Sequence, residues 1–216
     1  MTHLVTARAD ATSESARAVA RPSRLAGLLV LLLVATLLGA GWAGPADARS
    51  TTYAHPVEDY APYQPQTKCL RKVRPGILLL SDHLVQRGGG RGGIFRDCKS
   101  GGASEHKESR AFDWMLDASR KKDRKIARAF LDEIFAADAD GNPHAVARRM
   151  GIMYVIWNDR MWSSYRGFKP TRYLSSSCKK RKKCSKTLRH RDHVHVSVTR
   201  RAARGKLSWY LAQPSD

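Results

Sequence analysis

The chain has 216 residues, which leaves room for one domain of about 150 residues with extensions rather than for several full-sized domains. Its 39 Lys and Arg residues against 19 Asp and Glu residues give a formal net charge of +20. Such a field attracts polyanions, whether nucleic acid, anionic lipid or anionic cell-wall polymers, and the charge alone does not separate these partners.

Residues 1–48 have the layout of a secretory signal. Four arginines precede an apolar run over residues 25–42, and Ala46-Asp47-Ala48 supplies a small-x-small cleavage site. We expect cleavage after Ala48, with an N-terminal membrane anchor as the alternative, because about 18 apolar residues are long enough to span a bilayer. Both alternatives predict a secreted or cell-envelope protein. Membrane contact is expected only through an uncleaved N-terminal segment.

Residues 49–66 contain three prolines and few aliphatic side chains, which predicts a linker between this signal and a domain over residues 67–212. The apolar residues 77–85 predict a helix packed on the core. The five glycines of residues 87–93 predict a flexible surface loop. A phosphate cradle is the weaker alternative, since no Gly-Lys-Ser/Thr follows.

Residues 121–135 have apolar side chains at helical spacing and basic side chains on the other face, which predicts an amphipathic helix. A turn over residues 138–143, a short helix over 145–150 and a buried strand over 151–157 follow. Helix and strand patterns interleave irregularly. This arrangement favours an α+β fold with a small antiparallel sheet flanked by helices.

The segment from His193 to Val198 alternates cleanly, which predicts a strand with its three valines toward the core. His193, His195 and Ser197 then share the opposite face. His190 precedes the strand closely enough to curl over the same site. Three histidines in six residues favour a functional cluster, although single histidines are usually structural and basic chains also use histidines as simple polyanion contacts.

His106 and Asp113 are seven residues apart, a rise of about 10.5 Å on a helix, which is too far for two ligands of one zinc ion. They can converge only if the chain turns near residues 108–110. Residues 111–115 would then form a strand with Asp113 facing the metal. Together with His195 they make the three-ligand set of a catalytic zinc site, which keeps a fourth position open.

The four cysteines form no C-x-x-C pair, which argues against a cysteine zinc site and favours disulfides in an oxidising compartment. Proximity favours the pairs Cys69–Cys98 and Cys178–Cys184, although three pairings are formally possible. The second pair would close a loop of five consecutive cations, residues 179–183. This loop is interpreted either as solvated and mobile or as a contact for anionic wall polymers.

Ser104-x-His106, Ala111-x-Asp113 and the downstream His193-Val194-His195 resemble the motifs of the LAS superfamily of zinc peptidases. That superfamily includes D-alanyl-D-alanine carboxypeptidases, lysostaphin-type enzymes, murein endopeptidases and the hedgehog-like domain. A group of secreted, largely actinobacterial domains with Ser-Glu-His-Lys-Glu-Gly-Arg-Ala-x-Asp-Trp and His-x-Asp-His-x-His motifs is more similar still. The resemblance covers residues 69–197, and it implies a hedgehog-like fold.

The resemblance implies zinc as cofactor, with His106, Asp113 and His195 as its ligands. It also implies that His193 acts as general base or orients water. Arg96, with His190 as a second candidate, would stabilise the oxyanion or hold a substrate carboxylate. Substrate-binding positions implied in the same way are Ser104, Asn158 and Trp162.

Two positions depart from the family pattern. Ser109 replaces the family glycine and would be strained by about 1 kcal/mol if its φ is positive. The acidic general base of the carboxypeptidase branch is missing, because strand alternation is expected to point Asp192 away from the site.

The sequence therefore predicts an exported zinc metallopeptidase that hydrolyses peptide bonds of peptidoglycan stem peptides or cross-links, with peptidoglycan as partner and no nucleic acid. One alternative is a weakly active or inactive wall-binding module of the same fold. A secreted nuclease that uses the histidines to bind a metal is the other. A two-histidine phosphoesterase is a weak alternative, because His195-Val196-Ser197 matches half of its signature but no second His-x-Ser/Thr is present.

Overall fold

A computed structural model describes residues 53–214. The predicted signal or anchor over residues 1–48 lies outside the described residues. Within residues 53–214, no helix has the length and apolar character that crossing a membrane requires.

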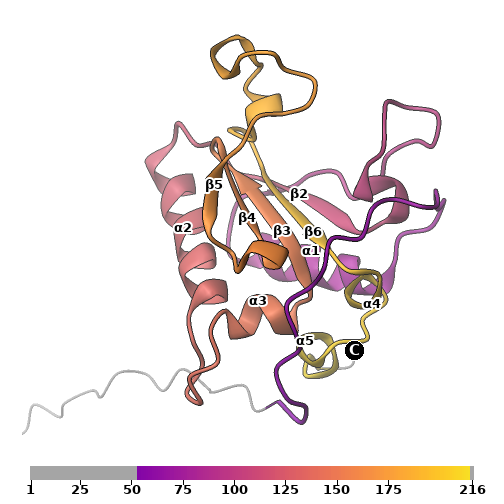
Figure 1. Ribbon diagram of the computed structural model, residues 1–216, viewed down its shortest axis with the longest axis vertical. Helices are drawn as coiled ribbons and strands as arrows, with labels where there is room; N and C mark the ends of the chain where they lie inside the picture. Colours follow the sequence, from indigo (N-terminus) through magenta and orange to yellow (C-terminus); the bar gives the residue numbers. More distant parts are fainter. Residues whose placement is uncertain (1–52, 215–216) are drawn as a thin grey trace, which may run out of the picture. The chain divides into compact units, whose positions relative to one another are not determined.

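A six-stranded sheet organises the fold, and every neighbouring pair of strands is antiparallel (Figure 1). The spatial order is β1-β2-β6-β3-β4-β5, so the three longest strands lie in the middle. The strands are β1 (Gly90–Arg91), β2 (Ala111–Met115), β3 (Ile152–Trp157), β4 (Arg160–Ser163), β5 (Pro170–Arg172) and β6 (Val194–Val198). The predicted α+β class, with a small antiparallel sheet flanked by helices, is confirmed.

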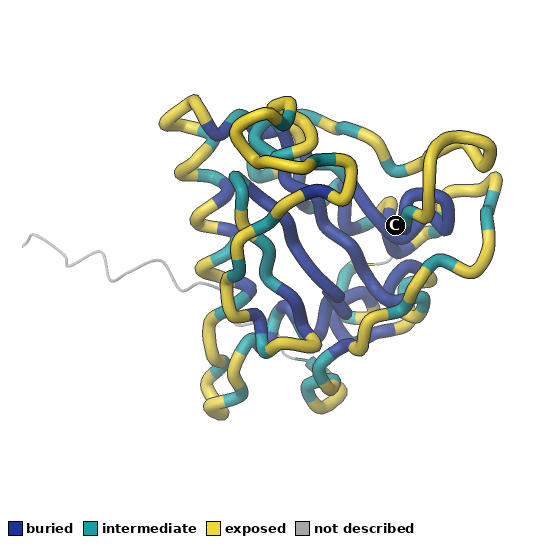
Figure 2. Tube along the Cα trace, turned by 45° about the horizontal axis from the view of Figure 1, so that its top comes forward, coloured by how far each residue is buried: buried dark blue, intermediate teal, exposed yellow. Residues whose placement is uncertain are grey.

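The longer helices pack on one face of this sheet, where the main hydrophobic core lies. The central strands are buried along their length (Figure 2). The alternating valines of β6 point into this core, and α2 adds Ala127, Phe130 and Ile134 at helical spacing. The helices are α1 (Pro75–Gln86), α2 (Lys121–Phe135), α3 (Ala145–Arg149), α4 (Arg200–Ala203) and α5 (Ser208–Leu211). Four single 3-10 turns complete the elements of residues 53–214: η1 (Glu105–Glu108), η2 (Ser164–Arg166), η3 (Arg181–Lys183) and η4 (Thr187–Arg189).

The glycine-rich segment is more ordered than the predicted flexible loop. Gly90 and Arg91 form β1, which pairs with Met115 and Trp114 of β2. A Cβ on Gly92 would lie 2.2 Å from the Asp113 carbonyl oxygen. The glycines therefore let one backbone approach another closely, and they do so beside the strand that carries Asp113.

Residues 53–66 have no helix or strand, as expected of a linker, but they pack on the domain rather than stand apart from it. Arg148 Nε donates to the Glu58 carbonyl at 2.6 Å, and the amide of Ser208 donates to Glu58 Oε1 at 2.6 Å. Further along, Gln64 Oε1 accepts from the amide of Arg200. This segment forms a belt along the domain.

Candidate metal centre

Three side chains from distant parts of the chain meet on the face of the sheet opposite the main core. His106 Nε2 lies 3.3 Å from both Asp113 Oδ1 and His195 Nδ1, and His195 Nδ1 lies 3.0 Å from Asp113 Oδ1. His106 and His195 are 5% and 8% exposed, so the group is open mainly at Asp113. These three side chains can hold a metal ion.

Local backbone geometry brings the three together. Asp113 of β2 is the direct cross-strand partner of His195 of β6, so their side chains leave the sheet on the same face. His106 comes from η1, and Ser109, the residue after η1, lies in the left-handed region with φ 51°. The chain thus turns near residues 108–110, as the sequence predicts, and Ser109 occupies a conformation that favours glycine. Its hydroxyl compensates in part, because Ser109 Oγ accepts a hydrogen bond from the amide of Arg74 at 2.9 Å.

Each of the two histidines has an outer partner for its second ring nitrogen. His106 Nδ1 lies 3.2 Å from the Ile94 carbonyl oxygen, and His195 Nε2 lies 2.9 Å from Ser197 Oγ. Such partners fix the ring orientation and leave the other nitrogen free for a ligand. Both rings therefore aim one nitrogen at Asp113.

The electrostatics of the group suit cation binding. Burial opposes ionisation of Asp113, but hydrogen bonds from His106 and His195 outweigh it and hold the pKa of Asp113 well below its usual range. Burial lowers the pKa of His195, which favours the neutral imidazole. An ionised carboxylate and a neutral imidazole are the protonation states that bind metals.

His193 stands beside the three ligands and is oriented by a carboxylate. Its Nε2 lies 3.6 Å from Asp113 Oδ1, while its Nδ1 lies 2.7 Å from Asp192 Oδ1. Asp192 also accepts a hydrogen bond from Thr187 Oγ1 at 2.6 Å. The expectation that Asp192 points away from the site is wrong, because β6 begins at Val194 and strand alternation does not extend to residue 192.

His190 also reaches the site, as the sequence suggests. Its ring centroid lies 4.8 Å from that of His193 and 5.6 Å from that of His195. Within the described residues, its buried Nδ1 has no hydrogen-bond partner. Burial, reinforced by the neighbouring imidazoles, lowers the pKa of His190 to about 3 and keeps the ring neutral near pH 7.

Sequence reasoning missed Tyr154 and Glu105. The Tyr154 ring stacks on His195 with centroids 5.6 Å apart, and its hydroxyl donates to Glu105 Oε2 at 2.8 Å. A β-bulge between Ile152 and Tyr154 shifts the register of β3 and brings Tyr154 opposite Ser197. The need of a buried tyrosine for a hydrogen-bond partner was the only signal in the sequence.

Of the other predicted site residues, some lie near the three candidate ligands and others do not. Arg96 is exposed, and no hydrogen bond or ion pair of its side chain occurs within residues 53–214. Asn158 adjoins the site through its amide, which donates to the His190 carbonyl at 2.7 Å. Trp162 does not join the site. It pairs with the core residue Val155 and packs near Phe135 of α2, on the opposite face of the sheet.

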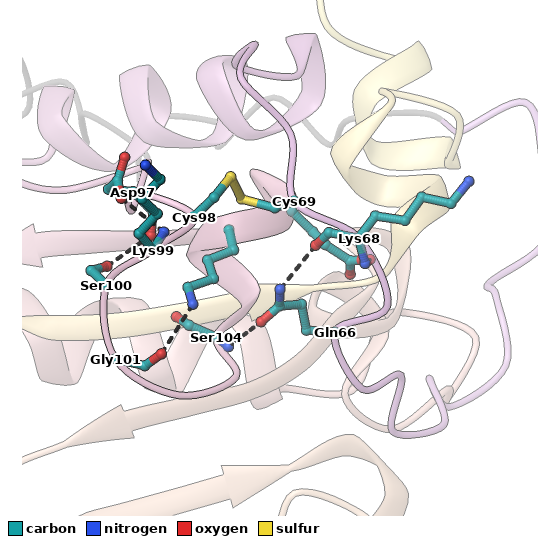
Figure 3. The surroundings of a disulfide bond; sticks show 11 residues. Gln66, Lys68, Cys69, Asp97, Cys98, Lys99, Ser100, Gly101 and Ser104 are labelled. Carbon is teal, nitrogen blue, oxygen red and sulfur yellow. Dashed lines mark hydrogen bonds between the residues drawn. A yellow bond between two sulfur atoms is a disulfide. The ribbon is translucent and has the colours of Figure 1, made fainter.

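The predicted disulfides Cys69–Cys98 and Cys178–Cys184 are both present. The first joins the segment just after the belt to the loop that leads into η1, where the Ser104 amide donates to Gln66 Oε1 at 2.7 Å (Figure 3). Disulfides of this kind indicate an oxidising environment outside the cytoplasm.

Among known protein families, a model described as "VldE, C-terminal domain" matches residues 69–182, just over half of the chain. No curated protein and no solved structure matches the chain. The matched region contains His106, Asp113 and the first disulfide, and it ends before the histidine cluster of residues 190–195.

Proposed function

This chain belongs to the VldE C-terminal domain family, and we propose that it is an exported zinc-dependent peptidase acting on peptide bonds of peptidoglycan stem peptides or cross-links. The observation that carries the proposal is the convergence of His106, Asp113 and His195, with His193 Nε2 beside them at 3.6 Å from Asp113 Oδ1. Three protein ligands and one open position are typical of catalytic rather than structural zinc.

The separations between the ligand atoms support zinc. Tetrahedral bonds of about 2.0–2.1 Å to zinc require ligand atoms about 3.3–3.4 Å apart. The three separations of 3.3, 3.3 and 3.0 Å lie close to that requirement. A zinc ion held by these residues would supply Lewis-acid chemistry for hydrolysis of an amide.

The proton chemistry is assigned to His193. With its Nδ1–H donated to Asp192, His193 has Nε2 free to accept a proton from the attacking water and to return it to the leaving amine. His190, kept neutral, can present a ring N–H to the oxygen on which charge develops. Tyr154 holds the His195 ring by stacking on it.

The substrate class rests on compartment and charge. The disulfides, the N-terminal signal pattern and the high positive charge all fit a protein working among anionic wall polymers. Outside the cytoplasm, the peptide cross-links of the wall are the substrate that the motif resemblance implies.

Digestion of purified sacculi, followed by mass spectrometry of the released muropeptides, tests this function. The zinc-loaded protein should release muropeptides with newly formed termini, and a chelator should abolish the release. His193→Gln should bind zinc but lose turnover, whereas the exposed His55→Gln should behave as the unmodified protein. Intact sacculi in the presence of a zinc-loaded protein would instead favour a non-catalytic wall-binding module. Cleavage of DNA in place of sacculi would favour a nuclease.

A further inference from the structure

A cluster of cations without carboxylate partners lies next to the site. The basic loop, defined here as residues 179–183 between Cys178 and Cys184, contains four lysines and Arg181. All five side chains are exposed, and within residues 53–214 none of them forms an ion pair. By contrast, the neighbouring Lys186 and Arg189 are paired with Asp117 and Asp159.

Covalent closure holds these charges together. The disulfide spans only six positions, and η3 gives the loop a turn of regular structure. Like charges held this close repel one another in water, and salt screens the repulsion only in part. A loop that served only as a solvated connection would relieve this repulsion by extending, whereas the disulfide keeps the cations concentrated. A bound anion would offset the repulsion.

The first turn of α2 extends the cationic surface. Arg120, just before α2, and Lys121, Lys122 and Lys125 at its start are exposed and form no ion pair within the described residues. Asp117 joins this turn to the segment after the loop, since its carboxylate lies 2.6 Å from Lys186 Nζ and its amide donates to Asp123 Oδ2 at 2.8 Å. The loop and the start of α2 lie on the same side of the domain (Figures 1 and 2).

This surface borders the candidate metal centre. The chain runs from the loop through η4 directly to His190. The amide of Asp159 donates to the Arg189 carbonyl at 3.1 Å, and the amide of Asn158 donates to the His190 carbonyl, so the segment is fixed to the end of β3. A polymer bound to the cations would pass beside the histidines.

We propose that the basic loop and the first turn of α2 form one docking surface for a phosphodiester-linked polymer of the cell wall. Seven of the nine cations are lysines, which bind phosphate as point charges without requiring planar, bidentate geometry. A cavity of about 290 Å³ in the loop is lined by Lys179, Lys180 and Lys183 together with the hydroxyl residues Ser177 and Ser185. Residues 174–189 contain no aromatic side chain on which a nucleic-acid base could stack.

Binding of labelled poly(glycerol phosphate) to the full chain at several salt concentrations tests this surface. The triple variant Lys180→Gln, Arg181→Gln, Lys182→Gln should bind at least tenfold more weakly, and the slope of log K against log salt should fall in magnitude by about 2. The matched control is Arg201→Gln, Arg204→Gln, Lys206→Gln, which removes three exposed cations around α4, beyond the opposite end of β6. It should weaken binding less than about twofold. Unchanged thermal midpoints establish that both variants fold.

A second variant separates an organised surface from charge alone. Cys178→Ser with Cys184→Ser keeps every cation but frees the loop, and it should weaken binding about three- to tenfold with the salt slope retained. Equal losses in the two triple variants would show that overall charge attracts the polymer and would overturn the proposal. Tighter binding of single-stranded DNA at equal salt would overturn the choice of partner. Chelated protein should bind the polymer as well as zinc-loaded protein, so this test does not depend on the proposed catalysis.

Discussion

The 2.7 Å contact between His193 Nδ1 and Asp192 Oδ1 determines which ring nitrogen of His193 is available to a substrate. An ionised carboxylate can only accept a hydrogen bond, so Nδ1 must carry the proton and Nε2 must face the site as a base. Thr187 holds the same carboxylate from its other oxygen. The role of the Asp192–His193 pair can therefore be tested at Asp192, which contacts His193 rather than a candidate metal ligand.

Asp192→Asn should leave zinc binding intact and lower turnover by at least tenfold and by up to about 10⁴-fold. The reason is that an amide can also donate, which allows the wrong imidazole tautomer. The measurement is kcat on a soluble muropeptide alongside zinc content. Asp140→Asn, at an exposed turn, should change neither. Full turnover in Asp192→Asn would remove His193 from the role of base.

For single residues, the sequence predicted the site where the residue type itself indicates the chemistry. His106, Asp113, His193 and His195 stood out because imidazole and carboxylate groups recur at metal sites. Asp192 was misjudged because the strand pattern was extended to residue 192, two residues before the strand begins at Val194.

Among the elements, the glycine-rich segment supports two ligands at once. The Gly93 carbonyl accepts from the amide of Asp113 at 2.8 Å, and the next carbonyl, that of Ile94, lies 3.2 Å from His106 Nδ1. Because the segment lies against β2, any side chain on Gly92 must displace one of the two backbones.

Gly92→Ala should therefore lower zinc affinity at least tenfold and destabilise the fold by about 1–3 kcal/mol, the usual range for overpacking. Zinc titration with a competing chelator and urea unfolding measure the two effects. Gly102→Ala is the matched control, since its Cβ would meet no atom within 4 Å. If the two variants behave alike, the close approach of Gly92 has no bearing on the site.

The turn between η1 and β2 also anchors a buried ion network. Glu108, 3% exposed, accepts from the amides of Thr67 and Lys68 and from Arg110 Nε at 2.6 Å. Arg110 is fully buried and also donates to the Gln64 carbonyl at 2.8 Å. Burial opposes ionisation of Glu108, but these donors outweigh it and lower the pKa of Glu108 to about 2.

Because the pKa of Glu108 is lowered from 4.5 by folding, its contribution to stability is complete above pH 4.5 and disappears as the pH falls toward 2. Urea unfolding at pH 7, 4.5 and 2.5 should show this loss in the unmodified protein. Glu108→Gln should be less stable at pH 7 by roughly 1–3 kcal/mol and should lose less on acidification. An unchanged acid dependence in the variant would assign the loss to other carboxylates.

Elements with a clear hydrophobic period could be predicted from the sequence, whereas very short elements could not. The helix over residues 121–135 and the strand over 111–115 have the predicted bounds, because several core side chains repeat at one period. Strands β1, β4 and β5 were not predicted, since two to four residues of mixed polarity carry no period. Their pairing depends on neighbours that are distant in the sequence.

In the whole domain, the candidate metal centre joins segments far apart along the chain. His106 and His195 are 89 residues apart and meet only in the folded state. A metal bound by all three ligands therefore stabilises the folded state over the unfolded one.

Removal of zinc with a chelator should lower the thermal midpoint by about 5–10 °C, since ligand at 100 times its Kd contributes about 2.7 kcal/mol. Added zinc should restore the midpoint, and Asp113→Ala should show neither change. Elemental analysis should find one zinc per chain. Iron at this position would contradict the assignment, because two histidines and one carboxylate also serve as ligands of iron.

The belt over residues 53–66 limits how many residues can be removed from the N-terminal side without loss of stability. The Gln64 carbonyl accepts a hydrogen bond from the buried guanidinium of Arg110. Glu58 Oε1 accepts one from the amide of Ser208, in the last helix of the domain. Cleavage after Ala48 leaves all of these contacts in place. A protease that cut beyond the belt would remove a hydrogen-bond partner of a buried cation and a contact of the C-terminal helix, so trimming that far should destabilise the domain.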